Sequence, residues 1–189
     1  MASRRGALFA AIVAAVVVAD QVSKAVVRDS MDLFEQVPVI DGVLWFTRIH
    51  NTGAAFGILR GQQWLLIITA VLMLSVVAYV MLRVRPASPW ARVALALVTG
   101  GAIGNLIDRV VLGGVTDFFD LGWFPVFNIA DIALDVGVAI LVFVLLVGGE
   151  HVPTHCAQGA AAGDEQPAAR DDEPRSGEVS ITDDRAFDA

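Results

Sequence analysis

The sequence contains little cysteine and little charge, and the common hydrolase signatures are missing from it. Its 189 residues include one cysteine, Cys156, so an intrachain disulfide is excluded. Only 17% of the residues are charged, and no cluster of Lys and Arg is interleaved with aromatic residues, which argues against a nucleic-acid partner. Neither the HExxH motif of zinc peptidases nor the GxSxG motif of serine hydrolases occurs. Disulfide scaffolds, nucleic-acid-binding proteins and two large hydrolase classes are therefore disfavoured.

Apolar residues dominate the composition instead. Hydrophobic residues make up 56% of the chain and its mean hydropathy is +0.67, which indicates a membrane environment. The formal net charge of -7 arises late in the chain, because residues 150–189 hold ten of the twenty acidic residues but three of the thirteen basic residues. The segment 151–189 has too little apolar surface to offset the entropy of ordering it, so we expect a disordered tail.

Four segments are long and apolar enough to cross a membrane as helices. Residues 64–82 form an uncharged run of nineteen, close to the roughly 20 residues that cross about 30 Å of hydrocarbon. Three other segments are equally apolar except for two charged residues in each, namely 7–27, 93–112 and 129–149. Gly100 and Gly104 form a GxxxG motif that would let another helix approach closely, although such motifs are frequent by chance. We predict four spans.

The first of these segments has an alternative interpretation as a cleaved signal peptide. Arg4 and Arg5 precede the uncharged run at 7–19, as a signal peptide requires. Cleavage near Ala19 would remove this helix, and with it the polar partners that the later spans need. We therefore interpret it as a retained span.

The two longer loops differ in composition. Residues 28–63 contain the β-rich run VLWFTRI at 43–49 and the turn-forming NTG at 51–53, which predict a small sheet at the membrane surface. Residues 113–128 are rich in aromatic residues, which suit the membrane interface. The expected fold class is an all-α integral membrane protein with four transmembrane helices and a small extracytoplasmic β-sheet between the first two. Residues 1–150 would form this membrane domain, followed by the tail.

Arginines in the short segments predict the orientation. Cytoplasmic segments close to span ends are enriched in Lys and Arg. The start of the chain and the tight loop between the second and third spans carry five arginines: Arg4, Arg5, Arg83, Arg85 and Arg92. The opposite loop also carries arginines, together with acidic residues, which weakens the rule. We expect both termini in the cytoplasm.

Charged and amide residues within the spans gather toward one membrane face. They lie near the C-terminal ends of the first and third spans and the N-terminal end of the fourth: Asp20, Lys24, Asn105, Asp108, Arg109, Asn128, Asp131 and Asp135. Because successive spans alternate in direction, these ends lie on one side, together with the loops that carry Asn51 and Asp117. An ionised side chain within a span costs about 2.5 to 3.5 kcal/mol on insertion scales, so such residues are usually paired or functional.

Some of these charges could simply neutralise one another. Asp20 and Lys24 are four residues apart and share a helix face, so they could form a structural pair. Arg109 could pair with Asp108 or extend to the interface. A purely structural role for these four residues therefore stays open.

Asp117 and Asp131 differ from the other acidic residues. Once the nearby cations are assigned to the remaining acids, these two have no obvious basic partner. Two unpaired carboxyl groups in one apolar site repel, so the pair holds one proton near neutral pH. In that state one carboxylate can take a proton from water while the other group donates to a scissile carbonyl oxygen. The pattern therefore predicts acid–base hydrolysis.

Five blocks of the sequence occur in a characteristic order. They are DQVSK at 20–24, NTGAAFG at 51–57, GGAIGNLIDRV at 100–110, VTDF at 115–118 and FNIAD at 127–131. In this order and spacing the chain resembles bacterial lipoprotein signal peptidase, also called signal peptidase II, a family of aspartic endopeptidases. Any one block alone would be weak. Together they cover every span except the second.

The resemblance implies roles for individual residues. Asp117 and Asp131 would be the catalytic dyad. Eight others would support the dyad and contact substrate: Asp20, Lys24, Asn51, Gly53, Asn105, Asp108, Arg109 and Asn128. The 28–63 region would form an extracytoplasmic sheet that cradles the substrate, and the 113–128 loop would close over the site.

The resemblance also implies a substrate and a location. The family cleaves prolipoproteins on the N-terminal side of a cysteine that carries diacylglycerol, and it uses no metal or organic cofactor. The chain would therefore act on diacylglyceryl prolipoproteins and contact membrane lipid. It would lie in the bacterial cytoplasmic (inner) membrane with its active site toward the extracytoplasmic face. We expect a monomer.

A few positions depart from the family pattern. Ile132 stands where many members have a small or polar residue, and Thr116 where an apolar residue is common, but neither departure removes a carboxylate. The alternative function is a proton-coupled small membrane transporter, which would also hold charges within its spans. Against it, the charges lie at one end rather than near the midplane, and the four spans show no inverted repeat.

Overall fold

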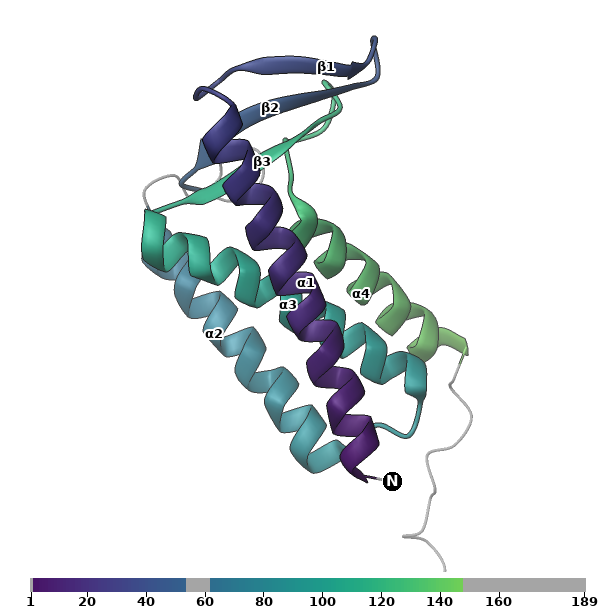
Figure 1. The fold of residues 1–189 in the computed structure, drawn as a ribbon. Coiled ribbons are helices and arrows are strands. Elements are labelled where there is room, and N and C mark those ends of the chain that lie inside the picture. Colours follow the sequence, from purple (N-terminus) through teal and green to yellow (C-terminus); the bar gives the residue numbers. More distant parts are fainter. Residues whose placement is uncertain (1, 54–61, 148–189) are drawn as a thin grey trace, which may run out of the picture. The chain divides into compact units, whose positions relative to one another are not determined.

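The computed structural model describes residues 2–53 and 62–147 (Figure 1). Its elements in chain order are α1 (Ala2–Ser30), β1 (Gln36–Ile40), β2 (Leu44–Asn51), α2 (Gln63–Tyr79), the π-helical turn η2 (Val80–Val84), α3 (Pro89–Leu112), β3 (Val115–Asp120) and α4 (Ile129–Val147). Three predicted features lie outside the described residues: the tail at 151–189, the last residues of the fourth span, and positions 54–57 of the NTGAAFG block.

Four helical segments are long and apolar enough to cross a membrane, as the sequence predicts. They are Arg4–Ser30, Gln63–Val84, Pro89–Leu112 and Ile129–Val147. Helix α3 is central, because it contacts each of the other three helices and 50% of its span is buried, against 17% or less of theirs. Val77 of α2 packs against Leu95 and Val98 of α3 in a buried cluster. Asn105 and Asp108, the buried polar residues of α3, are therefore surrounded by protein.

The third span begins earlier than its apolar run indicates. Helix α3 starts at Pro89 rather than at residue 93, and the Oγ of Ser88 accepts a hydrogen bond from the backbone N–H of Ala91 at 3.3 Å. Proline lacks the N–H that a first helical residue would leave unpaired, and serine is a favoured N-cap. Capping residues, rather than the start of hydrophobicity, determine where this helix begins.

The GxxxG motif of α3 marks the place where α1 crosses it. A Cβ atom at Gly100 would lie 2.7 Å from Cβ of Val16, and one at Gly104 would lie 2.6 Å from Oδ2 of Asp20. Both positions therefore require glycine for the observed packing. The close approach brings the carboxylate of Asp20 directly against the backbone of α3.

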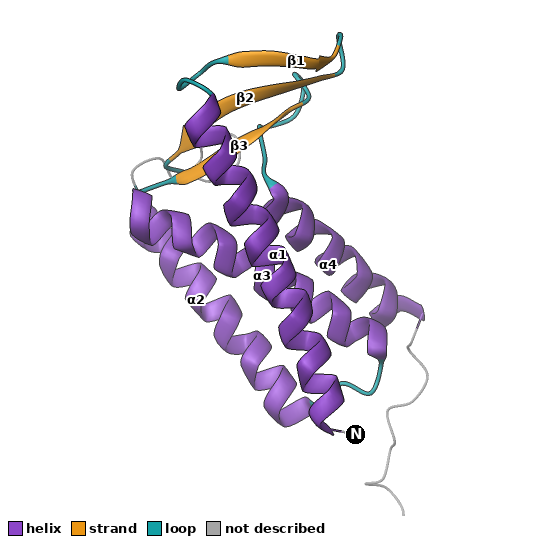
Figure 2. Cartoon of the chain, viewed as in Figure 1, coloured by secondary structure: helices purple, strands orange, loops and turns teal. Residues whose placement is uncertain are grey.

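The sheet has three antiparallel strands in the order β1-β2-β3, and Figure 2 shows them together at one end of the helices. The sequence placed the sheet in the loop between the first two spans alone, whereas β3 comes from the loop between α3 and α4. That second segment was interpreted as an interfacial loop because of its aromatic residues. Ile49 of β2 is opposite Asp117 of β3, so the sheet joins both loops.

Candidate active site

The residues predicted to converge lie at the end of the helical bundle that carries the sheet. α1 and α3 approach this end with their C-termini, α4 starts there, and β2 and β3 lie beside it (Figure 1). All ten candidate site residues belong to these elements or to the residues that flank them. This position at one end of the spans, away from their middle, disfavours the proton-coupled transporter.

Strand β3 holds Asp117 in a buried position. Its side chain is 2% exposed, and each carboxyl oxygen accepts one hydrogen bond from an asparagine. Asn51 Nδ2 donates to Oδ2 at 2.9 Å, and Asn128 Nδ2 donates to Oδ1 at 2.6 Å. The backbone N–H of Gly53 donates to Oδ1 of Asn51 at 3.0 Å, which turns the amide N–H groups of Asn51 toward the carboxyl group.

The first turn of α4 holds Asp131. The N–H of Asp131 donates to Oδ1 of Asn128 at 3.0 Å, and the N–H of Asn128 donates back to Oδ2 of Asp131 at 3.1 Å. This reciprocal pair is a capping box, with the aspartate at the position where a glutamate or glutamine is usual. Asn105 Nδ2 donates to the other oxygen, Oδ1, at 2.8 Å. Helix capping therefore fixes the orientation of the carboxylate.

Two asparagines join the two carboxyl groups into one network. Asn128 Nδ2 donates both to Asp117 and, at 3.1 Å, to Oδ1 of Asn105, while Asn105 Nδ2 donates to Asp131. The same Oδ1 of Asn105 accepts a hydrogen bond from Lys24 Nζ at 2.9 Å. A cation can only donate, so Lys24 determines which way the Asn105 amide faces.

A buried ionic cluster supports the elements that carry the two acids. Lys24 Nζ lies 2.8 Å from Oδ2 of Asp20 and 3.5 Å from Oδ2 of Asp108, and all three side chains are at most 1% exposed. Oδ1 of Asp20 accepts from the N–H of Ala130 in α4, and Oδ2 of Asp108 accepts from the N–H of Thr116 in β3, each at 3.0 Å. The cluster thus attaches both acid-bearing segments to α1 and α3.

Arg109 does not pair with Asp108, contrary to one of the structural interpretations. Asp108 is within ion-pair distance of Lys24 and, at 3.9 Å, of Arg28. Arg109 Nη1 donates to the backbone oxygen of Asn105 at 3.4 Å, and its buried Nε has no hydrogen-bond partner among the described residues. Asp108 and Arg109 are adjacent in sequence, but adjacent residues on a helix project about 100° apart, so they need not contact each other. Arg109 instead faces the cavity described next.

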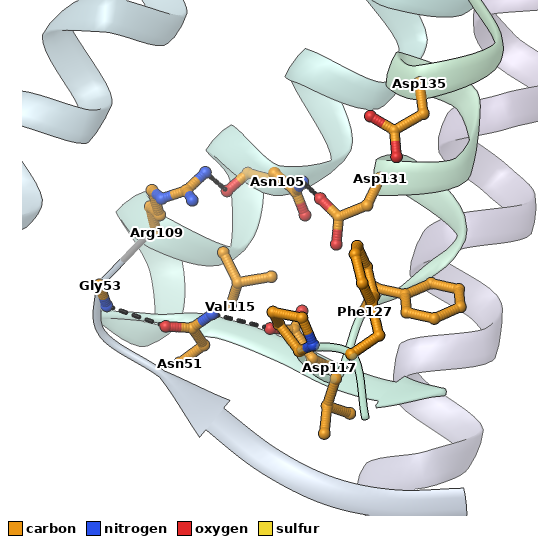
Figure 3. A pocket seen from close by; sticks show the side chains of 12 residues that line it. Asn51, Gly53, Asn105, Arg109, Val115, Asp117, Phe127, Asp131 and Asp135 are labelled. Atoms are coloured by element: carbon orange, nitrogen blue, oxygen red, sulfur yellow. Dashed lines mark hydrogen bonds between the residues drawn. The ribbon is translucent and has the colours of Figure 1, made fainter. Parts of the chain in front are cut away.

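A cavity of about 240 Å³ opens beside the two carboxyl groups (Figure 3). Polar side chains from β2, α3, β3 and α4 line it together with Gly53: Asn51, Asn105, Arg109, Asp117, Asp131 and Asp135. An apolar wall comes from residues 124–127, which fold back because the N–H of Phe127 donates to the oxygen of Phe119 at 3.0 Å. The cavity can therefore hold a polar reacting group beside apolar substituents.

Burial raises the pKa of Asp117 to about 7, and the negative charge of nearby Asp131 adds to this effect. The hydrogen bonds from Asn51 and Asn128 stabilise the carboxylate and oppose the rise. A carboxyl group with this pKa exchanges a proton readily at neutral pH. It is therefore suited to general acid–base chemistry.

The sequence did not single out two residues that complete the ionic cluster. Gln21 Nε2 donates to Oδ2 of Asp20 and to Oδ1 of Asp108, each at 3.1 Å. Thr116 is 3% exposed, and its Oγ1 accepts from Arg28 Nη1 at 3.1 Å. Gln21 lies next to Asp20 within the DQVSK block, and its place in that block is the sequence feature that could have identified it. Thr116, noted as a departure from the family pattern, has a hydrogen-bonding role here.

Known proteins are similar to this chain in sequence and in fold. A model of the family described as signal peptidase (SPase) II matches residues 12–147. The lipoprotein signal peptidase of Shouchella clausii (strain KSM-K16) is 44% identical over 142 residues, which cover 74% of this chain and 94% of the relative. That of Geobacillus kaustophilus (strain HTA426) is 47% identical over 134 residues, covering 69% and 87%.

Two solved structures of bacterial membrane enzymes have a similar fold. One superimposes with a TM-score of 0.73 and 34% identity, covering 76% of this chain and 90% of the other. The second has a TM-score of 0.69 and 35% identity, covering 74% and 93%.

Proposed function

The chain belongs to the signal peptidase (SPase) II family, and from this premise we propose that it removes signal peptides from prolipoproteins as an intramembrane aspartic endopeptidase. Its substrates are diacylglyceryl-modified prolipoproteins, cut on the N-terminal side of the lipidated cysteine. The enzyme is a multi-pass membrane peptidase, with four helices able to span the bilayer.

One observation supports the chemistry above all others. Asp117 on β3 and Asp131 on α4 line the same cavity, and Asn128 and Asn105 link their carboxyl groups by hydrogen bonds. The pKa of Asp117, about 7, favours a pair that holds one proton at neutral pH. A water molecule between the two groups would be activated without a covalent intermediate.

In the proposed reaction the dyad takes one proton from water and gives one proton to the substrate. The ionised carboxylate takes a proton from water, and the resulting hydroxide attacks the scissile carbonyl carbon. The protonated partner donates to the carbonyl oxygen as the C=O double bond opens to a tetrahedral intermediate. As that intermediate collapses, one of its hydroxyl groups gives its proton to the ionised carboxylate and re-forms a C=O bond. The C–N bond breaks, and the other carboxyl group passes the proton it took from water to the leaving amine, so the dyad again holds one proton.

The remaining candidate residues have positioning or binding roles in this proposal. Lys24 orients the Asn105 amide, and Asp20 and Asp108 hold the backbones of α4 and β3 through Ala130 and Thr116. Arg109 and Asn51, at the cavity wall, are placed to contact the substrate backbone.

The proposal includes a location. The enzyme lies in the bacterial cytoplasmic membrane, contacts membrane lipid and works as a monomer. Both termini are cytoplasmic, residues 1–150 form the peptidase domain, and residues 151–189 form an acidic tail. The active site then opens toward the extracytoplasmic face, where the sheet lies.

A cleavage assay with purified protein tests the proposed function. Wild-type enzyme is expected to cut a diacylglyceryl-modified prolipoprotein before its cysteine and to leave the unmodified precursor intact. A metal chelator is expected to change the rate less than twofold (about 0.4 kcal/mol at 1.36 kcal/mol per tenfold) because no step uses a metal. Cleavage that requires a metal, or equal cleavage of both precursors, would contradict the proposal.

The pH profile should show an alkaline limb. As pH rises above about 7, Asp117 loses its proton and the dyad lacks its general acid. The ratio kcat/KM is therefore expected to fall about tenfold per pH unit once pH exceeds this pKa. The measurement is initial cleavage rate from pH 6 to pH 9 at subsaturating substrate, with membrane insertion checked at each pH. A rate that stays constant to pH 9 would contradict a protonated Asp117.

A further inference from the structure

Asp135 is the charged residue of the cavity lining that the proposed chemistry does not use. It lies in α4 one turn after Asp131, on the same side of the helix, and it lines the same cavity (Figure 3). Its side chain is exposed, unlike those of Asp20 and Asp108. It is therefore available to a molecule that occupies the cavity.

The other acids in the spans already have partners within the protein. Asp20 and Asp108 pair with Lys24, and Asp131 accepts hydrogen bonds from Asn105 and Asn128. In the part of the chain that the structure describes, Asp135 has neither an ion-pair nor a hydrogen-bond partner. Ionisable groups within a span are costly and rarely retained without one. A substrate group in the cavity would supply the missing partner.

The position of Asp135 along α4 indicates which part of a substrate it meets. Four residues of helix advance about 6 Å, away from the sheet and into the membrane. A signal peptide crosses the membrane through its apolar segment and is cut at the C-terminal end of that segment. The residues level with Asp135 therefore precede the scissile bond, by about two positions in an extended peptide or about four in a helical one.

We propose that Asp135 is a specificity-determining residue that hydrogen-bonds to a hydroxyl side chain, Ser or Thr, in the signal peptide just before the scissile bond. This inference rests on the proposed function. A hydroxyl group both donates and accepts, so it can partner Asp135 in either protonation state. Arg109 is the basic residue of the cavity lining, and signal-peptide cations lie beyond the apolar segment, so a cationic partner is disfavoured.

Substrates that differ only in one hydroxyl group provide the test. Thr and Val have nearly the same shape, so lipidated precursors carrying either residue are compared at successive positions before the cysteine. Wild-type enzyme is expected to prefer Thr at one position by about fivefold in kcat/KM, the ratio that corresponds to about 1 kcal/mol for one hydrogen bond. Asp135→Leu is expected to bring the ratio to about one.

Two further variants separate recognition from a loss of folding. Asp135→Asn keeps a donor and an acceptor and is expected to retain the Thr preference. Val136→Leu changes the adjacent residue, which lies outside the cavity lining, and should leave the preference unchanged. Because each variant is judged by the ratio between two substrates, a lower amount of folded enzyme does not affect the result.

Equal use of Thr and Val by wild-type enzyme at every position would overturn the inference, as would the same Thr preference in wild type and Asp135→Leu. Either result leaves the proposed peptidase activity intact. If wild-type enzyme cleaves no lipidated precursor at all, the proposed function itself fails. The two failures are therefore distinguishable in one set of reactions.

Discussion

Asp117→Asn is expected to lower kcat/KM for a lipidated precursor by about 10³-fold or more, the effect of losing an essential acid–base group. The amide keeps the size and shape of the carboxyl group but cannot exchange the proton that the reaction needs. Its neighbours Asn51 and Asn128 both donate to this position, so the oxygen of the new amide retains one hydrogen bond. The measurement is precursor cleavage by purified, membrane-inserted enzyme.

The stability of the same variant provides an independent check. In wild type, the folded-state pKa of Asp117 is about 7, above its ordinary value of 3.8, so folding favours the protonated form. The stability associated with this group is complete at low pH and is lost as pH rises from about 4 to about 7. Asn does not ionise, so the melting temperature of the variant relative to wild type should increase over this range.

Asp120→Asn is the matched control on the same strand. Asp120 is also on β3, but its carboxylate accepts hydrogen bonds from Thr47 and Gln36 and lies outside the cavity lining. Its replacement is expected to change kcat/KM less than about threefold, since it makes no contact with the reacting groups. Activity of Asp117→Asn within tenfold of wild type would remove Asp117 from the chemistry.

The proposed dyad also predicts how the losses of activity in the two single variants combine in the double variant. Asp131→Asn is expected to be as inactive as Asp117→Asn, and the double variant should be no worse than either, because residues that act as a unit are not additive. Asn at position 131 still offers an oxygen to the N–H of Asn128, so the capping box is retained. If the two reductions in kcat/KM multiply in the double variant, Asp117 and Asp131 act independently of each other.

The sequence could predict the spans and the convergence of polar residues because both depend on local rules. Uninterrupted apolar length predicts a span, and alternation of direction places Asp20, Asp108 and Asp131 at one end whatever the details of packing. The resemblance added Gly53 and assigned supporting roles to Asn51 and Asn128, which the alternation of spans had already placed at that end. The structure brings all of these residues to the sheet end of the bundle.

The spacing of Asp20 and Lys24 predicted their ion pair, which the structure shows at 2.8 Å. Partner choice between helices could not be predicted, because it depends on the rotation of each helix about its axis. Asp108 and Arg109 are neighbours in sequence, yet Asp108 contacts Lys24 of another helix while Arg109 faces the cavity. Strand β3 was missed for a similar reason. Its backbone pairs with β2 from a distant part of the chain, and tertiary pairing overrides a weak local pattern.

Lys24→Met is expected to destabilise the folded protein by about 3 to 5 kcal/mol, the cost of leaving a buried charge without its partner. Lys24 and Asp20 are both 0% exposed, and their atoms lie 2.8 Å apart. Asp108 keeps Arg28 at 3.9 Å, so the uncompensated charge is mainly that of Asp20. Thermal or denaturant unfolding in detergent measures the loss, and Arg28→Met, at a cation 26% exposed on the same helix, should cost much less.

Neutralising the orphaned acid separates folding from orientation of the site. In the double variant Lys24→Met with Asp20→Asn no unpaired charge remains, and the new amide oxygen can still accept from the N–H of Ala130. Most of the lost stability should return, since an intact buried ion pair is often worth little more than a neutral replacement. Activity should stay low, because Oδ1 of Asn105 still lacks the cation that turns its Nδ2 toward Asp131. If stability and activity recover together in the double variant, Lys24 serves only to balance charge. If Lys24→Met alone loses no stability, the buried ion pair does not hold the site together.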